Sequence, residues 1–519
     1  MVLPVVRRIR DNLHGSIDIT ELEDAVIAHP FFQRLRRVRQ LAFLHYVFPG
    51  ATHTRFEHSL GVMHLAGISW EKLKANQERL RMSLERSPDF AQGESTTPGG
   101  ISHGRLFPTF ALMDRIFASD YALQCFRLAG LLHDVGHPPF SHSGEHFMPS
   151  WDEVRLTNPD MADYIADYID KKLEEGRAKG GALPRVRHEI YSILLIEKIL
   201  KYVYATPRSW KMTVDPRDVI AIINPAISPA PHSPLLAENS LNLLRELISG
   251  ELDIDRMDYL LRDSRECGVV YGVFDVDRIL DSLCLYYDDN DQQTHVAINL
   301  SGLAAFEDYL RARYSMYLQL YFHKSSVAAE AMMWNLCERL QDWRLPGKAE
   351  KYAAIDEYNI GPALWEAAHK LPEEERESVR IMVADLLYNR KLWKRVFEVS
   401  GPRDQLSRTI IEEAEAILKA EHIAHQEISS ANSLTRFQPR NGSARSHNSL
   451  RLIKKDERQI PRVCPIEDYS SLIASNDSVA IVRIYAAPRE TASGADTLSV
   501  QGIRDLLTQR LQSPHPRSP

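Results

Sequence analysis

The sequence predicts a mainly α-helical fold with a small β-containing region near the C-terminal end. Four long segments repeat apolar residues at steps of three and four, which is the period of an amphipathic helix: 25–44, 121–136, 188–203 and 306–340. Strand-like patterns are fewer, and they stand at 268–276, 294–300 and 478–488. We expect the first two of these to form small hairpins. Helices therefore dominate the predicted fold.

Composition and turn residues divide the chain into four parts. The helical pattern extends over 1–345, and a Pro/Gly/Ser-rich loop insertion interrupts it at about 84–106. Beyond it we expect a helical extension at 346–430 and a polar, flexible linker at 431–462. A small C-terminal lobe with a disordered tail is expected at 463–519. A length of 519 residues, 44% of them hydrophobic, suffices for a large core.

Charge and cysteine content exclude several classes of protein. A formal net charge of -7 argues against a protein that coats nucleic acid, so a nucleic-acid partner has no support in the composition. The five cysteines are dispersed and form no C-x-x-C pair, which indicates reduced thiols rather than a disulfide framework or a zinc finger. Because no signal peptide or membrane span is visible, we expect a cytoplasmic protein. The chain also lacks the P-loop of nucleotide triphosphatases.

Histidines and aspartates gather in three separate runs that together indicate a metal site. His133 and Asp134 close the apolar helix LAGLL just before Gly136, a helix-stop signal. A carboxylate beside such an apolar segment needs a partner, and a divalent cation is one. Taken alone, this dipeptide is more often an ordinary helix end. The additional runs HTRFEHSLGVMH at 53–64 and ELDIDRMDYLLRD at 251–263 make that simpler interpretation improbable.

These runs resemble the HD-superfamily deoxynucleoside triphosphate triphosphohydrolases, of the type that combines a sterile alpha motif with an HD domain. The strings YVFPGATHTRFEHSLGV, AGLLHDVGHPPFSHSGEH and ELDIDRMDYLLRDSRECGV carry the resemblance, which extends from Arg7 to about residue 340. It implies an HD-domain helical bundle that hydrolyses a deoxynucleoside triphosphate (dNTP) to deoxynucleoside and inorganic triphosphate. The implied cofactor is a divalent metal (Fe, Mn, Mg or Zn), with Mn or Mg supporting activity. Its ligands would be His58, His133, Asp134 and Asp255.

The resemblance also implies catalytic residues. The leaving 5′-oxygen of the sugar needs a proton, and histidine is the side chain best matched to neutral pH. His142 is the candidate acid, and Glu145, three residues further along the chain, would orient it. His137 and His188 match further active-site histidines of the family.

Substrate contacts carry over in two groups. Arg55 matches a contact to the α-phosphate, and Arg256, Tyr259 and Arg313 match contacts to the outer phosphates. Arg256 stands where the animal enzyme has Lys, which keeps the charge but changes the geometry. Four further residues match the deoxyribose pocket: Gln40 and Asp263 at the 3′-hydroxyl, with Leu41 and Tyr321 closing the 2′ side. A close wall at the 2′ position leaves no room for a ribose hydroxyl.

A regulatory nucleotide site is implied less completely. Gln33 and Arg36 match residues of the family's guanine pocket, and Arg7 and Arg278 match other cations of its regulatory sites. Ala28 replaces a guanine-binding Asp, and its methyl group offers no hydrogen bond to guanine. We therefore expect a homo-oligomer, a dimer or a tetramer, whose control by GTP is not implied.

Two other functions fit parts of the pattern. An HD phosphodiesterase or nucleotidase would act on a smaller nucleotide, but it would have no use for the outer-phosphate contacts Arg256, Tyr259 and Arg313. A non-catalytic nucleotide- or nucleic-acid-binding regulator would be expected to lose a metal ligand or the His142–Glu145 pair. The metal ligands and the His142–Glu145 pair are all present in the sequence.

Overall fold

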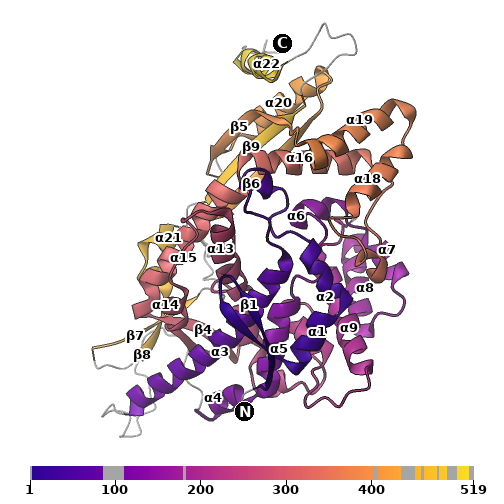
Figure 1. Ribbon diagram of the computed structural model, residues 1–519. Coiled ribbons are helices and arrows are strands. Elements are labelled where there is room, and N and C mark those ends of the chain that lie inside the picture. Colours follow the sequence, from indigo (N-terminus) through magenta and orange to yellow (C-terminus); the bar gives the residue numbers. More distant parts are fainter. Residues whose placement is uncertain are drawn as a thin grey trace.

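The computed structural model describes eight stretches of the chain, namely residues 3–85, 110–178, 183–402, 406–433, 450–457, 461–475, 478–487 and 499–512. Helices dominate them, as predicted (Figure 1). No helix among these residues is both long and apolar enough to cross a membrane. Most of the predicted insertion at 84–106 and the centre of the predicted linker lie outside the described residues.

The helices form a body that continues into the C-terminal half of the chain. Their bounds are α1 (Glu21–Ala28), α2 (Pro30–Gln33), α3 (Arg55–Glu85), α4 (Phe110–Ala118), α5 (Asp120–Leu132), α6 (Ser141–Gly144), α7 (Trp151–Thr157), α8 (Asp163–Ala178), α9 (His188–Ala205), α10 (Pro216–Ile223), α11 (Pro234–Ala237), α12 (Leu241–Ser249), α13 (Ile254–Cys267), α14 (Val276–Leu280), α15 (Leu303–Met316), α16 (Lys324–Arg339), α17 (Ala349–Tyr352), α18 (Ile360–His369), α19 (Glu373–Ala384), α20 (Arg408–Ala420), α21 (Ser471–Ser475) and α22 (Val500–Gln512).

Three small sheets accompany the helices. An antiparallel hairpin pairs β1 (Val5–Asp11) with β2 (Gly15–Thr20). The second sheet has the order β3-β4-β7-β8, formed by β3 (Leu283–Asp288), β4 (Gln293–Asn299), β7 (Arg451–Lys455) and β8 (Pro461–Pro465). The third has the order β5-β9-β6, formed by β5 (Lys394–Gly401), β9 (Ser478–Ala486) and β6 (His425–Ser433). Long-range pairing thus joins the C-terminal strands to the helical body.

The structure corrects one predicted strand. Residues 268–276 form a connection between two helices, and the first strand of the hairpin is β3, further along the chain. Gly268 ends α13 in the left-handed conformation, and the Asp275 side chain caps the first turn of α14. Because one helix ends at Gly268 and the next is capped by Asp275, the residues between them form a connection. The apolar content of this connection is nevertheless typical of a strand.

The C-terminal half holds more strand than its local pattern indicated. The segment 346–430, predicted to be a helical extension, contains α17 to α20 but also β5 and most of β6. Both strands pair with β9, which begins 77 residues after Gly401, the end of β5. The predicted linker likewise contains β7, because Leu452 and its neighbours pair in parallel with β4. The alternating segment that we expected at 478–488 is β9.

The core positions the site. One large hydrophobic cluster extends from the β1–β2 hairpin through α3, α5, α9 and α13 to α16 and α19. Most hydrophobic residues of α5 and α9 are buried, whereas Tyr202 near the end of α9 is exposed. A second, smaller core lies between the β5-β9-β6 sheet and helices α20 and α22, at one end of the molecule (Figure 1).

Glu330 on α16 generates a prediction about stability and pH. Burial raises the pKa of Glu330 from 4.5 to about 7. A carboxyl group whose pKa is higher in the folded state than in the unfolded state favours folding only while it is protonated. The free energy of unfolding therefore falls as the pH rises from about 4.5 through 7. We expect Glu330→Gln to raise the free energy of unfolding by about 2 kcal/mol at pH 8 and to change it little at pH 5. Urea denaturation at both pH values measures this, with the exposed Glu338→Gln on the same helix as the control. An equal effect at both pH values would contradict it.

Candidate metal centre and active site

The four predicted metal ligands come from the ends of three helices. His58 lies in the first turn of α3, His133 is the C-terminal cap of α5 with Asp134 directly after it, and Asp255 lies in the first turn of α13. Glycines allow these helices to approach one another. A Cβ atom on Gly61 would lie 1.9 Å from Asp258 Oδ1, and one on Gly130 would lie 3.1 Å from the Val62 carbonyl oxygen. Close helix packing therefore brings the four side chains together.

Their ligand atoms converge on one point. His58 Nε2 lies 3.0 Å from Asp255 Oδ1 and 3.6 Å from Asp134 Oδ2. His133 Nε2 lies 3.6 Å from the same Asp255 oxygen and 3.5 Å from Asp134 Oδ2. Both Nε2 atoms are buried, and neither has a hydrogen-bond partner among the described residues. Two imidazoles and two carboxylates with such orphaned nitrogens fit a divalent transition-metal ion.

Charge pairing keeps the carboxylates of this group ionised. Burial opposes ionisation of Asp134, but Arg55 and then His133 outweigh it and hold the pKa of Asp134 well below its usual range. The pKa of Asp255 is likewise lowered against the effect of burial, here by the neighbouring imidazoles of His133 and His58. Arg55 contacts Asp134 directly and donates a second hydrogen bond of 2.9 Å to Ser141 Oγ. The predicted α-phosphate contact thus lies directly beside the predicted ligands.

A buried network behind His58 was not singled out from the sequence. Asp258 Oδ2 accepts a 2.8 Å hydrogen bond from His58 Nδ1, and its other oxygen lies 2.6 Å from His14 Nε2. Arg262 donates to both Asp258 oxygens, at 2.9 and 3.0 Å, and also to Asp11 at the end of β1. The available signal was the three-residue step from Asp255 to Asp258, which places both carboxylates on one helical face. This network orients the imidazole of His58.

Two of the four predicted sugar contacts, Asp263 and Tyr321, meet in the structure. Asp263 accepts hydrogen bonds from His53 Nε2 and from the Tyr321 hydroxyl, each of 2.8 Å. Gln40 Oε1 is buried without a hydrogen-bond partner among the described residues, and Leu41 is partly buried against the core. The hydroxyl group of Tyr321 therefore positions Asp263, a role that the sequence did not suggest.

The predicted outer-phosphate contacts lie along α13 and α15. Arg256 is buried, donates to the Gly250 carbonyl at 3.0 Å and pairs with Asp253 at 3.2 Å. The guanidinium of Arg313 lies 5.9 Å from the Tyr317 ring centroid, and the Tyr317 hydroxyl is 3.4 Å from that of Tyr259. Buried Nε of Arg313 has no hydrogen-bond partner within the described part of the chain. The ring of Tyr259 is 6.4 Å from that of His58, so this path leads to the candidate metal ligands.

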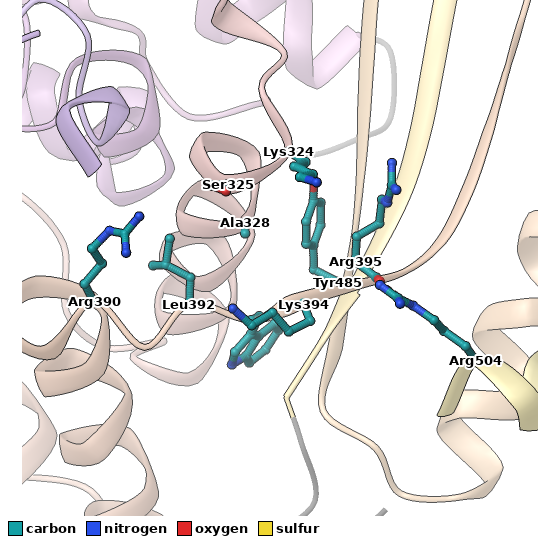
Figure 2. Close-up of a pocket in the computed structure, with 10 residues that line it drawn as sticks. Lys324, Ser325, Ala328, Arg390, Leu392, Lys394, Arg395, Tyr485 and Arg504 are labelled. Carbon is teal, nitrogen blue, oxygen red and sulfur yellow. The ribbon is translucent and has the colours of Figure 1, made fainter. Parts of the chain in front are cut away.

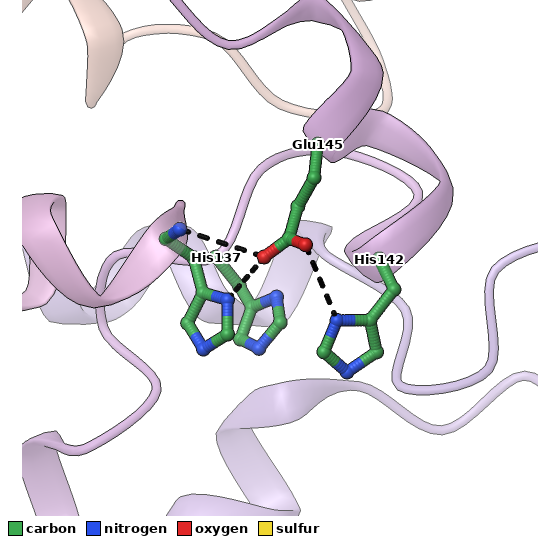
Figure 3. A group of neighbouring side chains, drawn as sticks. His137, His142 and Glu145 are labelled. Atoms are coloured by element: carbon green, nitrogen blue, oxygen red, sulfur yellow. Dashed lines mark hydrogen bonds and ion pairs between the residues drawn. The ribbon is translucent and has the colours of Figure 1, made fainter. Parts of the chain in front are cut away.

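Three of the four predicted catalytic residues, all histidines, gather around the carboxylate of the fourth, Glu145. Figure 3 shows His137 and His142 beside it. Glu145 contacts His188 Nδ1 and lies 3.7 Å from His142 Nδ1. The rings of His137 and His188 are stacked with centroids 3.6 Å apart, and His137 Nε2 lies 3.3 Å from Asp134 Oδ1. Burial opposes ionisation of Glu145, but the neighbouring His142 and His188 hold the pKa of Glu145 below its usual range. Glu145 is therefore an ionised acceptor that can orient the exposed His142.

The predicted regulatory residues do not all meet. Arg36 donates a 2.9 Å hydrogen bond to Gln33 Oε1 and stacks over the Phe56 ring at 3.5 Å. On β1, Arg7 pairs with Asp24 at 2.6 Å, and both side chains are partly exposed. Arg278 lies on α14, where it donates to the Ser301 carbonyl. Gln33 and Arg36 are therefore neighbours, whereas Arg7 and Arg278 lie on other elements.

A basic pocket elsewhere was missed from the sequence (Figure 2). It lies between α16, β5, β9 and α22, and its cationic lining consists of Lys324, Arg390, Lys394, Arg395 and Arg504. Tyr485 and Trp393 supply aromatic surface. Its cations come from segments far apart in sequence, so no local pattern indicated that they would meet.

The fold and the site define an HD-domain protein. The HD domain family matches residues 110–263, which include His133, Asp134 and Asp255, and the HD associated region matches residues 274–437. The chain therefore carries an HD domain followed by an HD associated region.

Several proteins are similar to the chain in sequence. An uncharacterised protein of Methanocaldococcus jannaschii, MJ1154, is 29% identical over 325 residues, or 63% of this chain and 48% of that protein. Human deoxynucleoside triphosphate triphosphohydrolase SAMHD1 is 27% identical over 350 residues, or 64% of this chain and 45% of its own length. The chain thus spans about half the length of these relatives.

Solved structures share the fold over nearly the whole chain. A hypothetical protein from Aquifex aeolicus superposes with a TM-score of 0.61 at 23% identity, covering 96% of this chain and 99% of that one. A phosphohydrolase from Bacteroides thetaiotaomicron, BT4208, superposes with a TM-score of 0.58 at 22% identity, covering 93% and 100%. At this level of identity the likeness concerns the fold.

Asp258 generates a prediction about metal retention. Asp258→Asn keeps the size of the side chain but removes the charge that fixes the His58 ring. We expect the affinity for Mn²⁺ to fall by about 10- to 100-fold, which is usual when the hydrogen-bond partner of a ligating histidine is lost. Calorimetric titration of the metal-free protein measures it.

Asp281→Asn, which removes an exposed partner of Lys72, is the matched control and should bind Mn²⁺ as the wild type does. Unchanged affinity in a folded Asp258→Asn protein would show that His58 does not depend on this carboxylate.

Proposed function

We propose that the protein is a metal-dependent hydrolase of dNTPs that releases deoxynucleoside and inorganic triphosphate. One observation carries the proposal: His58, His133 and Asp255 offer ligand atoms within 4.8 Å of one another, and Asp134 Oδ2 lies 3.6 and 3.5 Å from the Nε2 atoms of the two histidines. Both Nε2 atoms are buried without a hydrogen-bond partner among the described residues, and a cluster of three histidines and one glutamate lies directly beside them. A divalent cation held there would polarise a phosphoryl oxygen and lower the pKa of a bound water. The similarity to SAMHD1, which is named a dNTP triphosphohydrolase, supports this substrate class.

The chain's own residues divide the remaining work. Arg55 is buried between Asp134 and Ser141, where its guanidinium can bind the α-phosphate. His142 is exposed and lies beside ionised Glu145, so it can hold a proton on Nδ1 or Nε2 and deliver it to the leaving 5′-oxygen. Arg313, Tyr259 and Arg256 line the path to the outer phosphates, which a nucleoside monophosphate would not reach.

Location and assembly belong to the same proposal. All five cysteines are free thiols, in agreement with a reducing compartment such as the cytoplasm. The homo-oligomer is proposed on the family resemblance alone. Light scattering after gel filtration measures the oligomeric state.

Product analysis tests the reaction. The purified protein is incubated with each dNTP, and with GTP, in the presence of Mn²⁺ or Mg²⁺. We expect equimolar deoxynucleoside and inorganic triphosphate from at least one dNTP. Release of pyrophosphate or of free phosphate, or no turnover of any dNTP, would refute the proposal and favour a phosphodiesterase, a nucleotidase or a binding protein.

Removal of two ligands tests the metal site. We expect the His133→Ala/Asp134→Ala protein to lose bound metal and to turn over dNTPs at the background rate, with its helical circular dichroism retained. Metal content by mass spectrometry and product release are measured together. Normal turnover in this double variant would show that hydrolysis does not require a metal ion at this site.

Tyr321 generates a prediction about sugar selectivity. Tyr321→Ala removes the wall beside the 2′ position and the hydrogen bond that holds Asp263. We expect the ratio of kcat/KM for dGTP over GTP to fall by about 10- to 100-fold, since a pocket discriminates by the space and partners it offers. Tyr202→Ala, an exposed tyrosine on α9, is the control. An unchanged ratio would place the selectivity elsewhere.

A further inference from the structure

The connection from α5 to α6 sets the distance between a candidate metal ligand and the candidate acid. It starts after Asp134 and leads to His142, and we call its residues 136–142 the catalytic turn. Just before His142, two residues lie in the left-handed region of the backbone, with φ of 62° at Phe140 and 51° at Ser141. Side chains other than glycine rarely adopt this conformation, and it persists only where surrounding contacts hold it.

A segment far along the chain makes the first of these contacts. Residues 352–357 lie in the HD associated region and lead from the end of α17 toward α18. The Tyr352 hydroxyl donates a 2.6 Å hydrogen bond to the Gly136 carbonyl oxygen. The Tyr352 ring is fully buried and stacks on the ring of Tyr191 from α9, with 3.6 Å between the ring centroids. This stacking fixes the position of the hydroxyl group at the start of the catalytic turn.

A buried arginine joins the same two parts of the chain. Arg34 Nε donates a 2.7 Å hydrogen bond to the Ile355 carbonyl oxygen, and Arg34 Nη1 donates one of 2.8 Å to the His137 carbonyl oxygen. Arg34 is 1% exposed, and its guanidinium carbon lies 5.3 Å from the centroid of the Tyr352 ring. The 352–357 segment is therefore connected to the catalytic turn at a second point.

Glu357 supplies a third connection, at the left-handed residues themselves. Its Oε1 atom accepts hydrogen bonds from the backbone N–H groups of Arg39, at 2.8 Å, and of Phe140, at 3.4 Å. Its Oε2 atom lies 3.5 Å from Arg39 Nη1, and the Glu357 side chain is 10% exposed. Ser141 Oγ donates a 2.6 Å hydrogen bond to the Arg39 carbonyl oxygen. One carboxylate thus ties the catalytic turn to the segment that also carries Gln40.

We propose that Tyr352 and Glu357 are positioning residues for the hydrolysis, through which the HD associated region holds the catalytic turn in its left-handed conformation. Both residues contact the backbone of the turn, and the turn in its place sets where His142 lies relative to Asp134. Displacement of a catalytic group by about 1 Å can lower a rate about 100-fold. The effect on rate rests on the proposed function, whereas the effect on the turn does not.

Kinetics of three variants test the effect on rate. Tyr352→Phe removes only the hydroxyl group, and Glu357→Leu keeps the bulk of the side chain without an acceptor. We expect kcat for dNTP hydrolysis to fall about 10- to 100-fold in each, with KM and the affinity for Mn²⁺ unchanged. Glu357→Gln keeps an oxygen acceptor, so it should recover about tenfold of the loss in Glu357→Leu. Unchanged kcat in folded Tyr352→Phe and Glu357→Leu, or equal kcat in Glu357→Gln and Glu357→Leu, would contradict the proposal.

Matched controls remove contacts of the same kind elsewhere. Tyr164→Phe removes a hydroxyl contact from α8 to α9, and Glu153→Leu removes a carboxylate that accepts the Gly347 N–H group at 3.0 Å. Both controls should keep the wild-type kcat, and thermal denaturation measures the stability of every variant. If the controls lost as much kcat as Tyr352→Phe and Glu357→Leu at equal loss of stability, general destabilisation would explain the effect and the proposal would be wrong.

Hydrogen exchange tests the hold on the turn without any turnover. The backbone amides of residues 136–142 are followed by mass spectrometry of the full-length protein. We expect them to exchange at least about tenfold faster in Tyr352→Phe and Glu357→Leu than in the wild type, with the amides of α5 unchanged. Unchanged exchange in both variants would overturn the proposal. Absence of turnover with every dNTP would refute the proposed function, and exchange would still decide whether residues 352–357 hold the turn.

Discussion

The buried carboxylate of Asp258 is the interaction on which the geometry of the site depends. It joins His58 of α3, His14 of the β1–β2 turn and Arg262 of its own helix, and Arg262 extends the network to Asp11. Breaking one partner of such a buried pair costs about 3–5 kcal/mol, because it leaves an uncompensated charge. Gly61 makes this arrangement possible, since any side chain there would occupy the position of the carboxylate. The network thus fixes both the packing of α13 on α3 and the direction of the His58 ring.

Asp134 has a comparable position on the other side of His58. Arg55 neutralises it, His58 and His133 face one of its oxygens, and His137 faces the other. A single buried carboxylate therefore connects the candidate metal ligands, the candidate phosphate contact and the histidine cluster. A change at any one of these groups alters the field at the other two, so their effects on activity are coupled rather than additive.

The C-terminal half shows why local patterns fall short there. The pattern of β9 alternates clearly, and it was predictable because one face of the strand packs on α20 and α22. Strands β5 and β7 carry weaker alternation, and each becomes a strand by pairing with a distant segment. The basic pocket has the same origin, since Lys324 and Arg504 line one pocket only after α16 and α22 have packed near β5.

The sequence by itself determined the helical class of the protein and the identity of its candidate ligands. Helical period is a local property, and an adjacent His133–Asp134 pair at the end of an apolar helix can be read without knowledge of its neighbours. Only the tertiary structure decided that Asp258 and His14 support His58, that Tyr321 holds Asp263, and that three histidines gather around Glu145. Each of these contacts joins residues of separate elements. Their meeting depends on how helices pack in three dimensions, and no spacing along the chain encodes that directly.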